Sequence, residues 1–204
     1  MIRRLILDRK AAGAAEFALV LPLLILFLFG IIDGGRYLWE VNKAEKATQA
    51  GARVAIVTDV LDSGLSGQSY VGQTIGGVTL TQGDVIPVAA LGELKCTSTG
   101  CSCISGTCPT VVAPGDYATR FTRIFERMEF MKPGIAPANV SITYRGAGLG
   151  FAGDPNGMEI APLVTVELTG LQFRPLALFN AVAVSLPAFR TTLTAEDSSG
   201  SQSN

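Results

Sequence analysis

The 204-residue chain contains no histidine, and this absence removes whole classes of chemistry. Neither a Ser-His-Asp triad nor a Cys-His pair can form, and no imidazole is available to bind a metal ion. Charged residues make up only 16% of the chain and leave a formal net charge of −1, without the basic stripe that nucleic-acid binding requires. We therefore expect a protein that is not an enzyme, needs no cofactor or metal, and binds no nucleic acid.

Cysteine is scarce too, and its four copies fall in one short stretch: Cys96, Cys101, Cys103 and Cys108. Serine, threonine and glycine fill the spaces between them, which is typical of an exposed loop. An even number of cysteines in an exported chain favours two disulfides. Four thiolates binding zinc are the weaker alternative, because the spacing lacks the paired knuckles of structural zinc sites. Three disulfide pairings are possible, and the sequence does not choose among them.

A long apolar run near the N-terminus is the main positive feature of the sequence. Ala11 to Ile32 gives about 22 residues, the length that an α-helix needs to cross a hydrocarbon core about 30 Å thick. One carboxylate, Glu16, lies just inside this run, although a buried charge at mid-depth costs about 2.5–3.5 kcal/mol. Because such residues usually have a partner, Glu16 is a candidate functional residue.

Positive charge is concentrated before this run, at Arg3, Arg4, Arg9 and Lys10. Basic residues stay on the cytoplasmic side of a membrane, so the chain from Asp33 onward is expected outside the cytoplasm. A cleaved secretory signal is the alternative interpretation. It is disfavoured because residues 30–36 contain an acid and an arginine and no small-x-small cleavage site.

The helix is predicted to continue past the membrane surface, since the following residues are rich in helix formers and lack proline. Tyr37 and Trp39 occupy the place of an interfacial aromatic belt. A stripe of small residues then recurs at three- and four-residue intervals: Val41, Ala44, Thr48, Gly51 and Ala55. A helix face made of small residues permits close packing. The sequence does not decide whether this face packs on the chain's own domain or on neighbouring subunits.

Two features inside the apolar run bear on helix packing. Pro22 removes a backbone donor and so bends or loosens the helix. Gly30 and Gly34 form a G-x-x-x-G pattern, which suits close helix crossing.

Beyond Asp62 the pattern changes to short β-branched runs separated by glycine and proline. Strands are predicted at residues 78–81, 85–88, 140–144, 163–168 and 190–195. An amphipathic helix beginning after Asp116 is predicted from apolar residues at i, i+3, i+4 and i+7, namely Phe121, Ile124, Phe125 and Met128. Residues 173–179 fit either a surface-seeking segment near the membrane or a core strand and turn.

The order of features in the head resembles one known family. The TadE-like pilus assembly proteins, pseudopilins of the tight-adherence pilus, have an N-terminus similar to residues 9–24 (RKAAGAAEFALVLPLL) and 30–36 (GIIDGGR). Charge, small residues, acid, aromatic, proline and glycine occur in order, which makes the combination specific. The C-terminal segment with Phe173–Leu176 and a threonine-rich strand is also similar but less specific, and the cysteine-containing middle is not covered.

This resemblance implies an α+β, type IV pilin-like fold, in which a long N-terminal transmembrane helix is followed by an antiparallel sheet with a packed amphipathic helix. The expected parts are a basic cytoplasmic leader (1–11), a long helix with an extracytoplasmic extension (12–58), an extracytoplasmic domain (59–195) with a cysteine loop (96–108), and a disordered tail (196–204).

The resemblance also implies a function in assembly of a tight-adherence, type IV-like pilus through helix–helix packing. The implied assembly residues are Glu16, Phe17, Pro22, Gly30 and Gly34. The implied partners are the bacterial inner membrane, other pilin or pseudopilin subunits, a prepilin peptidase and the pilus assembly platform. The exported domain is then periplasmic, and incorporation into an extracellular pilus is left open.

Processing by the peptidase would separate Ala11 from Ala12, five positions before the glutamate. The family usually has glycine at the place of Ala11, and TadG-like relatives with a similar head can remain anchored in the membrane. The first alternative function is therefore a permanently membrane-anchored envelope protein whose exported domain binds a partner or surface ligand. The second, an exported enzyme, is disfavoured by the missing histidine.

Overall fold

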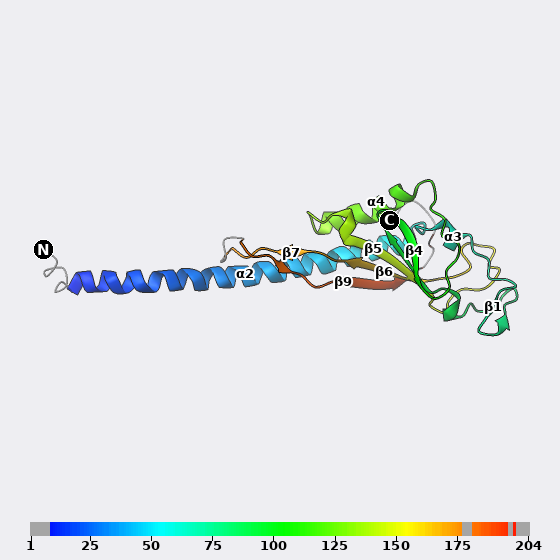
Figure 1. Ribbon diagram of the computed structural model, residues 1–204, viewed down its shortest axis with the longest axis horizontal. Helices are drawn as coiled ribbons and strands as arrows, with labels where there is room; N and C mark the ends of the chain where they lie inside the picture. The colour runs from blue at the N-terminus through cyan, green and yellow to red at the C-terminus, as the bar shows by residue number, and fades with distance from the viewer. Residues whose placement is uncertain (1–8, 177–180, 196–197, 199–204) are drawn as a thin grey trace. The chain divides into compact units, whose positions relative to one another are not determined.

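The computed structural model describes residues 9–176, 181–195 and 198, with side chains described from residue 13. The chain divides into two compact units, Met1–Val41 with Gln172–Ser185, and Asn42–Leu171 with Leu186–Asn204. The elements in chain order are α2 (Arg9–Val57), α3 (Ser63–Ser66), β1 (Thr74–Ile75), β2 (Val78–Thr79), the 3-10 turn η1 (Val88–Ala90), β3 (Glu93–Thr97), β4 (Gly100–Ser105), α4 (Tyr117–Met131), the 3-10 turn η2 (Pro137–Asn139), β5 (Val140–Arg145), β6 (Leu163–Leu168), β7 (Gln172–Phe173), β8 (Val184–Ser185) and β9 (Phe189–Thr194) (Figure 1).

The long apolar helix expected at the N-terminus is confirmed. Helix α2 runs for 49 residues, with Pro22 inside it and no break at Gly34 or Gly35. Within the described part of the chain, it is the one helix with the length and apolar composition needed to cross a membrane. Residues 1–8 of the expected leader lie outside the described residues.

The second unit is built on a five-stranded antiparallel sheet with the order β4-β3-β5-β6-β9. Successive side chains along each strand point to opposite faces of the sheet, and Val164, Val166 and Leu168 of β6 are buried on the core face. On the opposite face, Glu167 is paired across the strands with Arg190 and Ser141. The predicted strands at 140–144, 163–168 and 190–195 correspond to β5, β6 and β9.

The C-terminal part of α2 covers the core face of this sheet. Ala44, Ala47, Thr48 and Ala55 are buried there, and the Thr48 hydroxyl lies 2.9 Å from the Thr191 hydroxyl of β9. At Gly51 a Cβ atom would lie 2.6 Å from Met128 Cγ and 3.3 Å from Val166 Cγ1. The small-residue stripe therefore packs on the chain's own domain from residue 44 to residue 55.

Helix α4 confirms the predicted amphipathic helix. Its buried side chains are Tyr117, Phe121, Ile124 and Met128. Asp116 is the N-cap residue, but its side chain caps no backbone N–H. Its carboxylate accepts a 2.9 Å hydrogen bond from Arg120 Nε instead. The two helices and the sheet meet at Gly51, Met128 and Val166 and enclose the core of the second unit.

Two local expectations for the middle of the chain are wrong. Residues 85–88 are not a strand: Val85 makes a single bridge to Phe151, and Pro87 precedes η1. The stretch expected to be a cysteine loop is the β3–β4 hairpin, in which Leu94 and Cys96 are buried against β5. The serine, threonine and glycine residues suggested a loop. They are compatible with a strand here because β4 lies at the edge of the sheet, where the exposed face needs no apolar residues.

Candidate assembly surface

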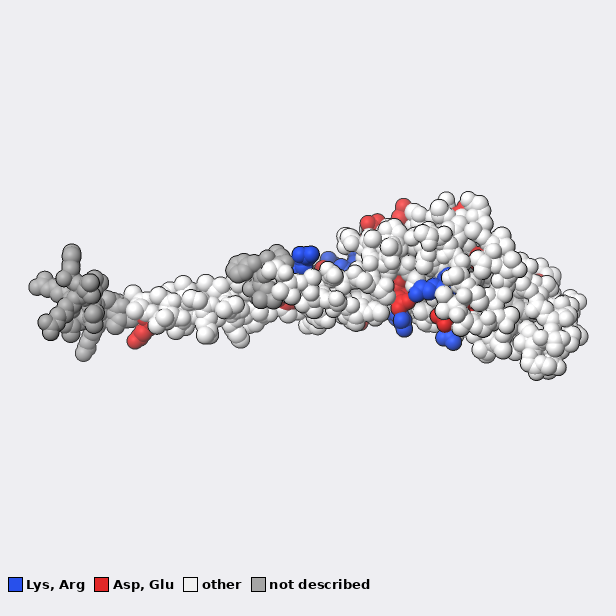
Figure 2. Space-filling model, viewed as in Figure 1, with Lys and Arg blue, Asp and Glu red and all other residues white. Residues whose placement is uncertain are grey.

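The first half of α2 is an almost uniformly apolar surface that the first unit leaves uncovered. Between residues 13 and 32, every side chain except the partly exposed Phe29 is exposed. Figure 2 shows this stretch nearly free of charged atoms. Exposed apolar surface on this scale marks contact with a membrane or with other proteins, so this part of α2 is the candidate assembly surface.

The predicted assembly residues lie on this surface, except Gly34, which lies two residues beyond it. Phe17 is 61% exposed, and Glu16 makes no hydrogen bond or ion pair with any residue that the structure describes. Pro22 lies inside the helix, and a Cβ atom at Gly30 or Gly34 would meet nothing within 4 Å. The expected processing residues Ala11 and Ala12 lie near the start of α2.

Asp33 ends the apolar stretch and is held by two donors. Its carboxylate is buried, with the residue only 8% exposed. Its Oδ1 atom accepts a 3.0 Å hydrogen bond from the Arg36 guanidinium and a 2.9 Å hydrogen bond from the Leu176 backbone N–H. A buried carboxylate needs such partners because its desolvation is costly. Asp33 therefore attaches the segment that follows β7 to α2 at Leu176.

The aromatic residues at this level of α2 have different environments. Tyr37, expected in an interfacial belt, packs edge-on against Phe173 with ring centroids 5.6 Å apart. The Arg36 guanidinium lies 5.4 Å from the centre of the same ring. Trp39 remains 63% exposed.

Sequence reasoning did not select Asp33 as a site residue. The Asp33–Arg36 spacing of i, i+3 was a detectable signal, since such pairs are neighbours on a helix. The second donor to Asp33 was not detectable, because the Leu176 N–H lies 143 positions away in the chain.

The cysteines form two disulfides, Cys96–Cys101 and Cys103–Cys108. The β3–β4 register decides the first pair, because Cys96 lies directly opposite Cys101. Cys108 closes the second bridge after β4 ends, and its Sγ approaches the Glu93 carbonyl at 3.7 Å. Both bridges therefore fasten the edge of the sheet.

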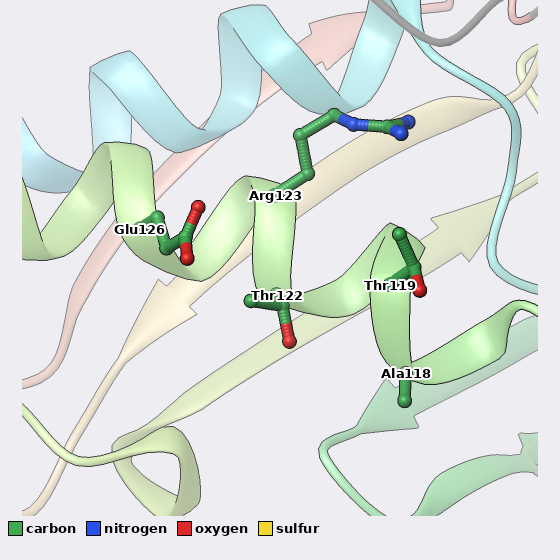
Figure 3. A pocket seen from close by; sticks show the side chains of 5 residues that line it. All are labelled: Ala118, Thr119, Thr122, Arg123 and Glu126. Atoms are coloured by element: carbon green, nitrogen blue, oxygen red, sulfur yellow. The ribbon is translucent and has the colours of Figure 1, made fainter.

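The surface of α4 carries a shallow hollow. It has a volume of about 350 Å³, and all five lining residues come from this one helix: Ala118, Thr119, Thr122, Arg123 and Glu126 (Figure 3). Small-molecule sites usually enclose their ligand between several apolar walls, whereas this hollow has one wall. Among the described residues, no three acidic or cysteine side chains are arranged to hold a metal ion.

Comparison with known proteins identifies the part of the chain that carries the candidate surface. Residues 11–53 match the TadE-like protein family. This TadE-like domain includes Glu16, Asp33 and Gly51, and it ends within α2. Neither the curated proteins nor the solved structures gave a significant match to the chain.

The TadE-like match agrees with the resemblance found from the head of the sequence. A TadE-like domain implies a pilin-like protein associated with the tight-adherence pilus, a generally non-enzymatic group. The sheet and α4 lie beyond the matched residues, so the architecture there is known from the structure alone.

Proposed function

We propose that this protein is a minor pilin or pseudopilin that takes part in assembling a tight-adherence, type IV-like pilus. The observation that carries the proposal is the TadE-like domain at 11–53 combined with the uncovered apolar surface of α2. Before assembly this surface lies in the inner membrane, with the N-terminus in the cytoplasm and the second unit in the periplasm. During assembly the same surface packs against helices of other subunits.

Glu16 supplies the specific contact in this proposal. Cleavage after Ala11 gives Ala12 a free ammonium group, and a neighbouring subunit displaced along the helix axis brings Glu16 beside it. Opposite charges about 4 Å apart attract by about 4 kcal/mol at an effective dielectric constant of about 20. This attraction offsets the cost of about 2.5–3.5 kcal/mol for a carboxylate at mid-depth in the membrane. The exposed, unpartnered Glu16 among the described residues supports this role.

The test is the Glu16→Leu variant. Leucine should leave membrane insertion intact or improve it, because it removes the charge, and it should abolish incorporation into the pilus. Glu45→Leu is the matched control, since Glu45 is an exposed glutamate of the same helix outside the apolar run. Membrane fractionation and quantification of the subunit in purified pili measure the two effects. Normal incorporation of Glu16→Leu at wild-type abundance would reject the charge pair.

A permanently anchored envelope protein is the second candidate function. Alanine at position 11, where the family usually has glycine, favours it. N-terminal sequencing in cells with active prepilin peptidase separates the two: a mature chain beginning at Ala12 supports the pilin, and an intact Met1 supports the anchored protein. An Ala11→Leu variant that inserts normally but is not cut would further support processing.

A further inference from the structure

Residues 172–176 and 181–185 contain the two strands of the β7–β8 hairpin, and these two stretches are meant by the hairpin below. Strands β7 and β8 pair antiparallel, and Figure 1 shows β7 beside the helix. Phe173 contacts Tyr37, whereas Leu176, three residues later, donates its N–H to Asp33, four residues earlier in the helix. The chain leaving β7 therefore runs back along α2 toward the apolar stretch that ends at Ile32.

This hairpin presents aliphatic side chains to its surroundings. Leu176 is 41% exposed, Val182 is 48% exposed and Val184 is 41% exposed. Phe173, in contrast, is buried against α2 and fixes the base of the hairpin. The exposed aliphatic side chains are thus not buried by the helix, and Leu176 lies at Asp33, the residue that directly follows the apolar surface of α2.

The Asp33 carboxylate is hydrogen-bonded in a way that suits a medium with little water. Asp33 Oδ1 takes hydrogen bonds from both Arg36 and the Leu176 N–H. A backbone donor and a carboxylate that would each be costly near hydrocarbon are thereby paired with one another. Two arginines, Arg36 and Arg174, are exposed at the same level and carry the charge that lipid phosphates attract.

The length of this part of α2 is slightly greater than the thickness of the headgroup region of a bilayer. From Asp33 to Trp39 the helix advances about 9 Å at about 1.5 Å per residue. The polar region on each side of a bilayer is about 5–8 Å thick. Exposed Trp39, the single tryptophan of the chain, lies at the far end of this interval, where tryptophan is enriched in membrane proteins.

We propose that the β7–β8 hairpin, residues 172–176 and 181–185, is a membrane-surface element. Leu176, Val182 and Val184 enter the boundary between headgroups and acyl chains on the periplasmic side, and Arg36 and Arg174 contact lipid phosphates. The partner is the lipid surface of the bilayer that α2 crosses, so the inference rests on the proposed membrane anchoring. The hairpin then sets the depth of α2, and Asp33 is the positioning residue that couples the two.

Tryptophan fluorescence in vesicles tests this proposal with the full chain. The protein is reconstituted at high lipid-to-protein ratio in phosphatidylcholine–phosphatidylglycerol vesicles, in a Trp39→Phe background that removes the native signal. Val182→Trp and Val184→Trp each place one reporter on the hairpin. We expect both to be quenched about twofold more by lipids brominated near the headgroup than by lipids brominated near the chain end, as a shallow, interfacial position requires.

Two further reporters are controls. Val78→Trp places tryptophan at an exposed valine of the β1–β2 hairpin, and it should be quenched by neither lipid. Phe27→Trp reports the apolar run of α2 and should be quenched more by the deeper bromines.

The outcomes separate the two proposals. Deep quenching at Phe27→Trp without quenching at either hairpin reporter would overturn the hairpin proposal and leave the membrane anchor standing. Absence of lipid quenching at all three positions would reject both. Hairpin reporters that are shielded from aqueous iodide but not quenched by brominated lipid would show that a second copy of the chain covers the hairpin, which also overturns the proposal.

Discussion

Among single residues, Gly51 and Asp62 have structural roles that their residue types alone do not indicate. Gly51 lets α2 approach α4 and β6 more closely than any side chain would allow. Asp62, fully buried, accepts a 2.9 Å hydrogen bond from the Leu65 N–H and a 2.8 Å hydrogen bond from the Val112 N–H. It therefore caps α3 and fixes the chain that follows β4.

Replacing Gly51 should destabilise the second unit. Gly51→Val forces Met128 and Val166 to move, and overpacking of this kind costs about 1–3 kcal/mol. Gly35→Ala is the control in the same helix, because a Cβ there meets nothing within 4 Å. Thermal unfolding of the full chain in detergent micelles measures both. Equal stability of the two variants would contradict close packing at Gly51.

Glu159 should make the stability of the second unit depend on pH. Burial raises the pKa of Glu159, but hydrogen bonds from the Gly153 and Tyr70 N–H groups and the Ser69 hydroxyl lower it by more, so the net pKa lies below its usual value. A carboxyl whose pKa is lower in the folded state stabilises the fold above the unfolded pKa, and this contribution is lost as pH falls through the folded pKa.

Glu159→Gln should therefore be less stable than wild type at neutral pH, by about 1 kcal/mol, because it loses a charged hydrogen-bond acceptor. The difference should shrink on acidification below the usual glutamate pKa of about 4.3. Chemical unfolding of both proteins across this pH range measures the effect. A difference that stays constant or grows with acidification would contradict the role given to the carboxylate.

At the scale of elements, the β3–β4 hairpin is the part that sequence patterns described least well. Its residues alternate weakly because β4 is an edge strand with one exposed face. The two disulfides bracket this edge, but their surroundings differ. Cys96 is fully buried on the core side, whereas Cys103 is exposed.

The two disulfides should therefore be reduced in a fixed order. A water-soluble phosphine should reduce Cys103–Cys108 in the native protein before Cys96–Cys101, because attack requires access to a sulfur atom. Alkylation followed by peptide mass analysis gives the order. Replacing Cys103 and Cys108 together by alanine should cost about 2 kcal/mol, the chain-entropy value for a short loop. Simultaneous loss of both bridges under native conditions would show that burial of Cys96 gives no protection.

At the scale of the whole molecule, the charge pattern of the head and the cysteine pairs should report the same topology. If the basic head holds the N-terminus in the cytoplasm, the cysteines are in an oxidising compartment. Thiol labelling of the unfolded, native-source protein should then find almost no free thiol. Replacing Arg3, Arg4, Arg9 and Lys10 by glutamine should give a mixed orientation, with a fraction of chains carrying four free thiols. Full oxidation of this variant would contradict the positive-inside argument.

The sequence by itself determined the features that depend on neighbours along the chain. The length of α2 could be predicted because a membrane-length apolar run is followed directly by residues rich in helix formers. The buried face of α4 follows from the spacing of Phe121, Ile124 and Met128. Strands β5, β6 and β9 could be predicted because β-branched residues alternate across a half-buried sheet. The head was sufficient to suggest the TadE-like domain, since its residues occur in a fixed order.

Only the tertiary structure decided which distant residues meet. The small-residue stripe of α2 could have served the chain's own domain or a neighbour, and the contacts of Gly51 with Met128 and Val166 assign it to the domain. The β3–β4 register was needed to assign the first cysteine pair. The tertiary structure was also needed to identify the Leu176 N–H, far along the chain, as a partner of Asp33. Such contacts depend on strand register and on how distant segments pack together, and no local sequence pattern encodes either. The physical reason is that residues far apart in sequence become neighbours only when the core is packed.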